Sequence, residues 1–432
     1  MEYGIRRWSS IFKGDMGMGQ VRNKDIILLL RQTIKSVDRL LMDHGSRTAY
    51  ILYKMLQEEG KLEIYELADY VVFATFHDIG AYRTEELEDM LKFETKSFMP
   101  HSIYGYLFFK KWSPFTGEDK ILLYHHANCE QYDKINYAFK NIASYLFLAD
   151  RMDIYYITQG STFDIYSLRK YEGTRYTKEA LDLLEKAARK TNILEKLANE
   201  TYQTELDQLL DYLVISNEDE EKYIHMIVNS MGFRDQRYTV DTAVCMCICE
   251  EIATKMYLTE KQKKILKYAA LIHDIGMLLL PQEMINAPRK LTSDEMMTLE
   301  THVEMLEPIF RKILPGDIVD VAITHHENGA GSGYPKRIKA MDMNTSQRIF
   351  QVADMVTSLS SKRTYRDAKD SKEIETILQE GVKANRLSPE VVSVLLQNYD
   401  IIMAKAKKEK EQLIGTYAAL EKEYEQSSGT YL

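Results

Sequence analysis

The sequence is poor in the residues and patterns that accompany a β-rich, disordered or membrane-spanning protein. It has 8 prolines and 20 glycines in 432 residues, too few for a sandwich with many turns or for long disordered linkers. It also has no run of 18 apolar residues and no secretory signal segment. We therefore expect a cytoplasmic protein with no membrane partner.

Cysteine is scarce as well, and three of the four cysteines are Cys245, Cys247 and Cys249. Zinc sites built on paired cysteines usually have a two-residue gap on a turn. Here the spacing falls inside an apolar helical stretch, and there is no second cluster. Buried, reduced thiols in a helix core are therefore favoured over a zinc site.

The sequence has fewer positively charged residues than negatively charged ones, with 56 Lys and Arg against 65 Asp and Glu. The formal net charge is −9 at pH 7, so no DNA or RNA partner is expected. A small anionic ligand would need a local cluster of cations or metal ions. The 45% hydrophobic and 28% charged content is ordinary for a globular protein, and the length corresponds to two or three domains of roughly 150 residues.

Amphipathic helix is what the sequence has in abundance. Apolar residues recur at intervals of three and four, and no stretch alternates as a half-buried strand would. This pattern predicts an all-α protein. Clear helical stretches are 26–42, 65–76, 181–197, 205–213, 242–256 and 373–380.

A pattern of histidines and aspartates occurs twice along the chain. Each copy has His-Asp-Ile-Gly, then a single histidine, then a His-His doublet, and then an aspartate after an apolar stretch. The first copy is His77, Asp78, His101, His125, His126 and Asp150, preceded by His44. The second copy is His273, Asp274, His302, His325, His326 and Asp354, preceded at the matching place by Asp241. Nine of the ten histidines belong to this pattern, which disfavours a purely structural role for them.

These residue types suit divalent transition-metal ions, because imidazole and carboxylate are their usual ligands. Neighbouring residues on a helix point about 100° apart, so a doublet at a helix end can serve two ions. The two oxygens of Asp78 or Asp274 can bridge a metal pair. We expect Gly80 and Gly276 to adopt the left-handed turn that ends a helix. This turn would place each His-Asp pair at the opening of a site and not in the middle of a helix. Two metals activate water and clamp a phosphoryl group, so no serine or cysteine nucleophile is needed.

The repeated motif resembles the HD phosphohydrolase superfamily. The second copy is similar to its HD-GYP members over residues 235–385, since Gly333-Tyr334-Pro335 follow the paired histidines and Arg363-Thr364-Tyr365-Arg366 close the motif. The first copy, residues 40–155, resembles a plain HD domain without Gly-Tyr-Pro. The resemblance implies helical bundles with two or three iron or manganese ions and hydrolysis of cyclic di-GMP.

Carried over by position, the resemblance implies metal ligands and substrate contacts. Asp78 and Asp274 would be the catalytic, metal-bridging residues, and Gly333, Tyr334, Pro335, Arg363 and Arg366 would lie at the substrate. The metal ligands would be His44, His77, Asp78, His101, His125, His126 and Asp150 in the first copy, and Asp241, His273, Asp274, His302, His325, His326 and Asp354 in the second.

The second copy departs from the family pattern at several positions. Asp241 replaces the first histidine ligand, Met277 and Ala287 replace two lysines, and Thr357 replaces an aspartate. These changes favour a reduced activity for the second copy, whereas the first copy has the more complete ligand set. In the first copy, Ala81 replaces one of the lysines.

We expect four segments: an N-terminal HD domain (1–160), a helical connector (161–232), a C-terminal HD-GYP-like domain (233–400) and a C-terminal helical tail (401–432). The expected activity is hydrolysis of cyclic di-GMP, or a related cyclic dinucleotide, with two divalent ions per active site. Iron or manganese is favoured, with zinc, nickel or magnesium as alternatives. Two other functions stay open: a nucleotide or other phosphoester phosphohydrolase, and a cyclic-dinucleotide sensor that controls the N-terminal site. A homodimer is compatible with the sequence.

Overall fold

The computed structural model describes residues 21–84, 99–132 and 134–431. Within these residues the chain forms α-helices and short 3-10 helices, and the only β pairing consists of isolated bridges. The prediction of an all-α protein is therefore confirmed. The first 20 residues of the predicted N-terminal domain lie outside the described residues.

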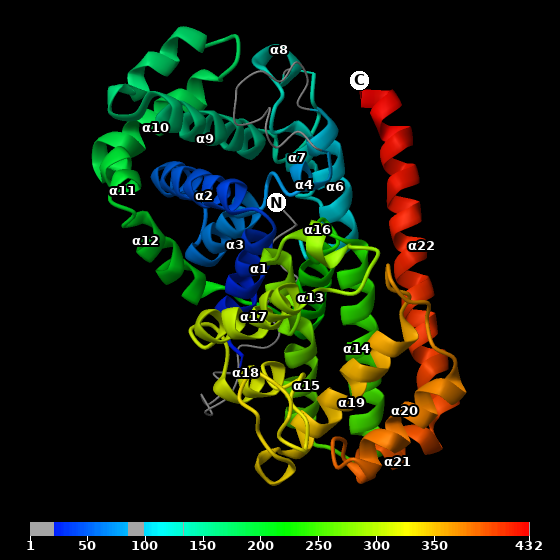
Figure 1. Ribbon diagram of the computed structural model, residues 1–432. Helices are drawn as coiled ribbons and strands as arrows, with labels where there is room; N and C mark the ends of the chain where they lie inside the picture. Colours follow the sequence, from blue (N-terminus) through cyan, green and yellow to red (C-terminus); the bar gives the residue numbers. More distant parts are fainter. Residues whose placement is uncertain (1–20, 85–98, 133, 432) are drawn as a thin grey trace.

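Two groups of helices follow one another along the chain (Figure 1). The first group is α1 (Asn23–Val37), α2 (Arg39–Glu59), α3 (Ile64–Thr75), α4 (Ala81–Thr84), α6 (Met99–Trp112), α7 (Lys120–Tyr124), α8 (Cys129–Tyr132) and α9 (Lys140–Gln159). The next segment holds η1 (Gly160–Thr162), η2 (Ile165–Tyr171), α10 (Lys178–Thr191), α11 (Ile193–Ala198), α12 (Tyr202–Leu209) and η3 (Leu210–Tyr212).

The second group begins before the second histidine pattern. It comprises α13 (Asn217–Met231), α14 (Gln236–Lys255), α15 (Glu260–Ile272), η4 (Ile275–Leu279), α16 (Gln282–Ile285), α17 (Ser293–Phe310), α18 (Gly316–Ala322), η5 (Ala340–Asp342), α19 (Thr345–Ser360), α20 (Ser371–Lys383), α21 (Pro389–Gln397) and the long α22 (Tyr399–Tyr431).

Helix α2 is central to the first bundle, where it packs against α3, α9 and α10. The segment predicted as a connector does not run freely between the bundles: α10 packs on α2 and α9, and α12 packs on α2 and α3. Helix α13, the last helix of that segment, packs instead on α1 and α14. The connector thus contributes helices to both bundles, and the domain boundaries stay predictions.

Helix α14 is central to the second bundle, where it packs against α15, α19 and α22. Helix α1, from the start of the chain, packs against α13 and joins the two bundles. One continuous hydrophobic cluster runs from Val21 to Leu420 through both bundles. The two copies therefore share a core, as Figure 1 shows with the first bundle above and the second below.

The predicted C-terminal tail is part of α22, which spans both bundles (Figure 1). It packs along α14 of the second bundle and α6 of the first. The hydroxyl of Tyr417 donates a hydrogen bond to the carbonyl oxygen of Asn229 at 3.0 Å, and its ring lies 5.6 Å from that of Trp112. Near its end, Glu421 forms an ion pair with Arg83 at 3.0 Å. Helix α22 therefore fastens the bundles together.

Two stretches predicted as single helices are broken. Residues 26–42 divide between α1 and α2 at Asp38, which is extended and whose side chain accepts a hydrogen bond from the backbone N–H of Leu41. Residues 181–197 divide between α10 and α11 at Asn192, which is left-handed (φ 49°). Both residues favour helix ends over helix interiors, because their side chains cap or tolerate the left-handed region.

Two predictions from the residue content can be compared with the structure. All four cysteines are free, and within α14 Cys245 and Cys249 are buried while Cys247 is partly exposed. Reduced thiols in a helix core are thus confirmed for Cys245 and Cys249. Among the described helices, none is long and apolar enough to cross a membrane.

Candidate metal centres

Each His-Asp pair lies just beyond the end of a helix. His77 and Asp78 follow α3, which ends at Thr75, and His273 is the residue after α15. The doublets lie at helix ends too, with His125 next to the end of α7 and His325 beyond the end of α18. Helix ends bring these side chains together at one point in each bundle.

The reason for the glycine after each His-Asp-Ile is close packing, and the predicted left-handed conformation is wrong. Neither Gly80 nor Gly276 is among the residues with positive φ. A Cβ atom added to Gly80 would lie 2.0 Å from the carbonyl oxygen of His101, and one on Gly276 would lie 2.2 Å from that of His302. Glycine is required because the helix carrying the next histidine packs directly on this backbone.

In the first bundle, the carboxylate of Asp78 lies between two sets of histidines. Its Oδ2 is 3.2 Å from Nε2 of His77 and 3.5 Å from Nε2 of His44. Its Oδ1 is 3.5 Å from Nε2 of His125 and 3.7 Å from Nε2 of His101. The ligand atoms form two groups that share this aspartate: His44, His77, Asp78 and Asp150 in one, and Asp78, His101, His125 and His126 in the other.

The first cluster fits a pair of divalent ions. Buried polar atoms normally have hydrogen-bond partners, but both oxygens of Asp78 and Nε2 of His44, His77 and His125 have none. Asp150 Oδ1 is also buried and has no hydrogen-bond partner. These atoms converge on the centre, and each ligand group lies within 4.8 Å. Nitrogen and oxygen donors in this arrangement suit iron, manganese or zinc.

The opposite nitrogen of these imidazoles is hydrogen-bonded to the protein. Nδ1 of His77 lies 2.8 Å from the carbonyl oxygen of Ala74, and Nδ1 of His125 lies 2.6 Å from that of Leu122. Each contact lets Nδ1–H donate, which leaves Nε2 as the acceptor that faces the centre. The rings are therefore oriented before any ion arrives.

His44 is supported by a charged chain formed by Asp153 and Arg47. Its Nδ1 lies 2.8 Å from Asp153, whose two oxygens accept hydrogen bonds from the guanidinium of Arg47 at 2.7 and 3.0 Å. Arg47 was not predicted. The sequence could have indicated Arg47, because it lies three residues after His44 on α2. Residues three apart lie on the same face of a helix.

The protonation states of the first cluster suit metal binding, with one exception. Burial lowers the pKa of His126 well below its usual value, and the charges of His125 and Arg151 lower it further. Burial opposes ionisation of Asp78, but the nearby histidines hold its pKa well below the usual range. Burial also opposes protonation of His44, yet its hydrogen bond to Asp153 and the nearby carboxylates of Asp150 and Asp78 raise its pKa well above the usual value. His44 must therefore lose a proton to become a ligand.

In the second bundle, Asp274 again lies among histidines, but the set is smaller. Its Oδ2 is 3.3 Å from Nε2 of His273, and its Oδ1 is 3.6 Å from Nε2 of His302 and 3.9 Å from that of His325. His273 Nε2 is also 3.6 Å from Asp354. Within the described residues, only His302, His325 and His326 form a compact ligand group here. This geometry fits one ion better than two.

The structure does not bring Asp241 into this cluster. Its Oδ1 accepts a hydrogen bond from the hydroxyl of Ser361 at 2.6 Å, and its Oδ2 is paired with Arg363 at 2.7 Å. The predicted substrate residue Arg366 is also engaged, because its guanidinium donates to the carbonyl oxygens of Ser358 and Leu359 at the end of α19. Arg366 thus caps a helix, a role that cations often have.

The Gly-Tyr-Pro loop lies beside the second cluster. The ring of Tyr334 lies 4.7 Å from that of His326, centroid to centroid. A Cβ atom on Gly333 would lie 2.4 Å from the carbonyl oxygen of His326, so only glycine lets the loop approach so closely. Pro335 follows Tyr334 through a cis peptide bond. The carboxylate of Glu327, which sequence reasoning missed, accepts hydrogen bonds from the backbone of Lys336 and Ile338 and holds the loop.

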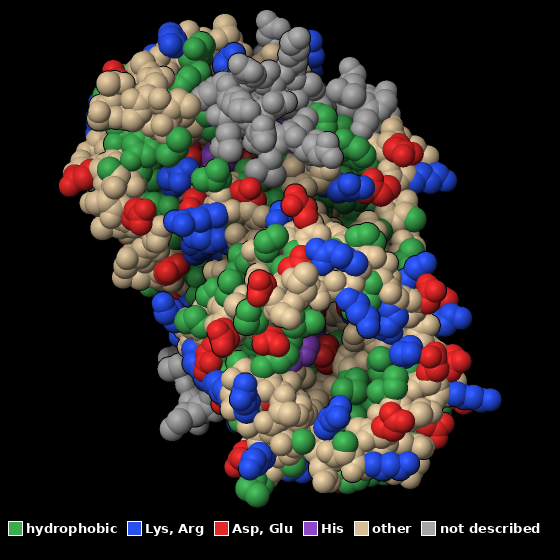
Figure 2. All heavy atoms as spheres, viewed as in Figure 1, with side chains coloured by type: hydrophobic (Ala, Val, Ile, Leu, Met, Phe, Trp, Pro, Cys, Tyr) green, Lys and Arg blue, Asp and Glu red, His purple; other side chains and the backbone are tan. Residues whose placement is uncertain are grey.

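The two clusters differ in exposure. The side chains of Asp78 and Asp150 are 4% and 0% exposed, whereas those of Asp274 and Asp354 are 27% and 17% exposed. Figure 2 shows a histidine and acidic side chains in a hollow over the lower, C-terminal half of the molecule. The second cluster is therefore reachable by a ligand in the described structure.

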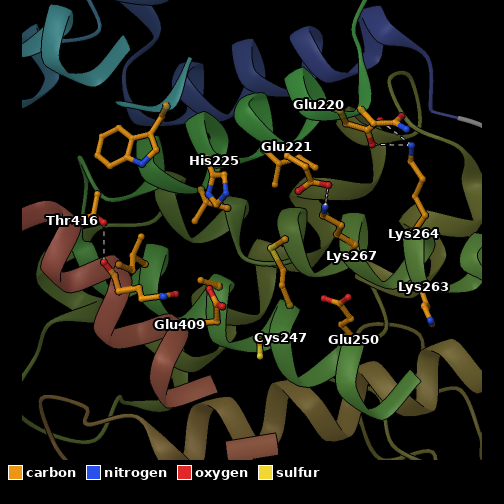
Figure 3. A pocket seen from close by; sticks show the side chains of 18 of the residues that line it. Glu220, Glu221, His225, Cys247, Glu250, Lys263, Lys264, Lys267, Glu409 and Thr416 are labelled. Carbon is orange, nitrogen blue, oxygen red and sulfur yellow. Dashed lines mark hydrogen bonds and ion pairs between the residues drawn. The ribbon is translucent and has the colours of Figure 1, made fainter. Parts of the chain in front are cut away.

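One cavity lies apart from both clusters. It has a volume of about 900 Å³ and lies between α6, α13, α14, α15 and α22. Figure 3 shows acidic and lysine side chains around it, with ion pairs from Lys264 to Glu220 and from Lys267 to Glu221. His225, the one histidine outside the repeated pattern, also lines it. It holds none of the predicted metal ligands.

Comparisons with known proteins agree with this description. Residues 223–391 match the family model described as HD domain. The 3'3'-cGAMP-specific phosphodiesterase 1 of Vibrio cholerae serotype O1 is 23% identical over 91% of this chain and 96% of its own length. A cyclic di-GMP phosphodiesterase of Thermotoga maritima is 28% identical to this chain. The aligned region covers 53% of this chain and 60% of that protein.

A solved structure shows the same fold. The crystal structure of a cyclic GMP-AMP-specific phosphodiesterase of V. cholerae matches with a TM-score of 0.56 and 15% identity, covering 88% of this chain and 97% of that one. Residues 223–391 thus form an HD domain, and together with the helical bundles and the His/Asp clusters this match supports a metal-dependent phosphohydrolase.

Proposed function

We propose that this protein is a phosphodiesterase that hydrolyses a cyclic dinucleotide of the cyclic di-GMP or 3'3'-cGAMP kind. The observation that carries the proposal is the position of Asp78, whose two carboxylate oxygens each face two histidine Nε2 atoms at 3.2–3.7 Å. A carboxylate in this position can bridge two divalent ions. Such pairs serve in-line displacement at phosphorus.

The chain's own residues prepare the site for that chemistry. Two divalent ions, of which iron or manganese is our first choice, would activate water and stabilise charge on the phosphate. Asp78 and the surrounding histidines would hold the ions in the first bundle, and Asp274 with His302, His325 and His326 would hold an ion in the second. The Nδ1 hydrogen bonds to backbone carbonyls keep the ring orientations fixed.

The substrate class is supported by the relatives. Those named above act on cyclic di-GMP or 3'3'-cGAMP according to their names, and one of them aligns along nearly the whole chain. The second cluster is more exposed than the first, and with its Gly-Tyr-Pro loop it offers a surface for a dinucleotide. Tyr334, whose ring is tilted by 33° against that of His326, offers an aromatic face for a base.

A second function has its own supporting observation. Because Asp241 is paired with Arg363 and lies outside the second cluster, that cluster has fewer donors than the first. A protein whose second bundle binds a cyclic dinucleotide without cutting it, and so controls the first bundle, would have this arrangement. Both functions share the ligand and differ in which aspartate hydrolysis requires.

The test is turnover of cyclic di-GMP and 3'3'-cGAMP with Mn²⁺ or Fe²⁺, with products separated by chromatography. Wild type is compared with Asp78→Asn and Asp274→Asn, and Asp207→Asn on the surface serves as the control. Loss of turnover in Asp274→Asn alone assigns hydrolysis to the second bundle. Loss in Asp78→Asn alone assigns hydrolysis to the first bundle and supports the second bundle as a sensor. Absence of turnover of both substrates in metal-loaded wild type contradicts the proposal.

A further inference from the structure

Asp241 lies on the face of α14 that borders the second cluster. Tyr238, Asp241 and Cys245 are three and four residues apart and so share one side of the helix. Helix α14 packs against α15, which ends next to His273, and against α19, which carries Asp354. The pKa of Tyr238 is raised to about 12 by burial, and the charge of Asp274 adds to the effect. The pKa of Cys245 is raised chiefly by its contact with Cys249 and by burial, and His273 and Asp354 also act on it.

Asp241 occupies the same place in the repeat as His44, but its side chain has different partners. In the first bundle, Nε2 of His44 is 3.2 Å from Asp150 and 3.5 Å from Asp78, so it completes a four-residue ligand group. In the second bundle, the matching group of His273, Asp274 and Asp354 lacks its fourth donor. Both oxygens of Asp241 are taken, one by Ser361 and the other by Arg363.

Arg363 is held at this position by a tight turn. Its backbone N–H donates to the carbonyl oxygen of Arg366 at 2.7 Å, and the reverse hydrogen bond is 3.2 Å long. The guanidinium of Arg366 anchors the turn to the end of α19. The side chain of Arg363 is nevertheless 25% exposed, so its guanidinium can meet a ligand. A guanidinium binds phosphate at least as well as carboxylate, because its fork of N–H groups matches either anion.

We propose that Arg363 is a switch that couples phosphate binding to completion of the second metal centre. A phosphodiester and Asp241 compete for the same guanidinium. When the phosphodiester binds Arg363, Asp241 is released and becomes the fourth donor beside His273, Asp274 and Asp354. Without phosphate, the second bundle holds one ion; with phosphate, it holds two. This inference rests on the proposed function, because it assumes that the second cluster binds metal.

The coupling follows from charge. A paired Asp241 is neutralised by Arg363 and attracts a cation weakly. Once a phosphate takes its place, the centre gains a free carboxylate and a nearby phosphate, and both favour a second divalent ion. By linkage, the ion and the phosphate each raise the affinity of the other. An enzyme built this way assembles its second metal only when substrate is present.

The experiment counts Mn²⁺ in the full chain carrying Asp78→Asn, which removes the bridging ligand of the first bundle. Bound Mn²⁺ is measured by elemental analysis after desalting, and Mn–Mn coupling is measured by electron paramagnetic resonance. Dimethyl phosphate is the probe, since it has the charge of a phosphodiester. We expect one ion without the probe and two with it. Adding Arg363→Gln should give two ions in the absence of the probe.

Matched variants separate the switch from general damage. Asp241→Asn should hold one ion with or without dimethyl phosphate, also when combined with Arg363→Gln. Ser361→Ala removes a neutral partner of Asp241 and keeps the ion pair with Arg363. The number of Mn²⁺ ions that this variant binds should therefore equal that of the parent. Circular dichroism and thermal melting establish that each variant folds.

Three outcomes would overturn the switch: two ions in the parent without the probe, no gain of an ion in Arg363→Gln, or a gain in Asp241→Asn. The metal count does not depend on turnover. If cyclic dinucleotides are hydrolysed but the count never changes, only the switch fails. If the count changes as expected but no cyclic dinucleotide is cut, only the proposed function fails.

Discussion

Asp153 lies 2.8 Å from Nδ1 of His44 and thereby sets the direction in which this imidazole faces the first cluster. Arg47 fixes Asp153 in turn, through two hydrogen bonds. Asp153 itself is fully buried and does not belong to either ligand group. The predicted ligand His44 is thus positioned by a residue that lies outside both ligand groups.

Asp153→Asn should weaken metal binding at the first cluster. Loss of such an outer hydrogen-bond partner typically lowers metal affinity by about 10–100-fold. Titration of Mn²⁺ by calorimetry, in a chain that also carries Asp274→Asn, measures this affinity alone. Asp43→Asn, on the same helix but in surface ion pairs with Lys35 and Arg39, is the control and should bind as the parent does. An unchanged affinity in Asp153→Asn would show that His44 needs no such support.

Metal binding at the first cluster should become stronger as pH rises through neutrality. Burial lowers the pKa of His44, but its three carboxylate partners raise it well above the usual value, so metal-free protein carries a proton there. An ion must displace this proton, and therefore acid opposes binding and base favours it until the pH exceeds the pKa of His44. Calorimetry in two buffers of different ionisation enthalpy counts the released protons. We expect about one proton, and fewer in Asp153→Asn.

Much of the site was predictable because the chemistry itself limits the residue types. The repeated order of His-Asp, His, His-His and Asp predicted the side chains that the structure brings together in the first bundle and part of those in the second, and the helical periodicity predicted the fold. Relations between distant segments were not predictable. The ion pair of Asp241 with Arg363 joins residues more than a hundred positions apart. Nothing in the local sequence indicates it, since either residue alone is compatible with a metal or phosphate role.

The glycines after His-Asp-Ile illustrate the same limit. Glycine is typical of left-handed turns, so local reasoning predicted a positive φ. The structure instead shows a backbone contact with the helix that carries the next histidine. Such a contact depends on how two helices pack, and it is decided by the tertiary structure. The residue was correctly singled out, but for a conformation that it does not adopt.

Gly276→Ala should destabilise the protein and displace a ligand. The added Cβ would lie 2.2 Å from the carbonyl oxygen of His302, which forces α17 away from η4. Overpacking of this kind costs about 1–3 kcal/mol, and the lost alignment of His302 should reduce Mn²⁺ binding. Thermal and urea unfolding measure the first effect. Gly415→Ala is the control: no atom lies within 4 Å of its added Cβ on α22, so we expect a gain of up to about 1 kcal/mol.

Tyr417→Ala should loosen the attachment of α22 to both bundles. The side chain is largely buried, donates a hydrogen bond to the carbonyl oxygen of Asn229 and packs near Trp112. Its removal leaves a cavity at the junction of α6, α13 and α22, and truncation of a large buried aromatic costs about 3–5 kcal/mol. Urea unfolding should show that loss, and amide hydrogen exchange should rise in α22 and in the adjoining ends of α6 and α13.

Tyr257→Ala is the matched control for this variant. Its side chain is 94% exposed, so the free energy of unfolding should change by no more than about 0.5 kcal/mol. If Tyr417→Ala behaves like Tyr257→Ala, then α22 does not fasten the bundles. If it destabilises the protein while exchange rises in the second bundle only, α22 belongs to that bundle alone. Equal increases on α6 and α13 would identify α22 as the element through which the two metal centres share one folding unit.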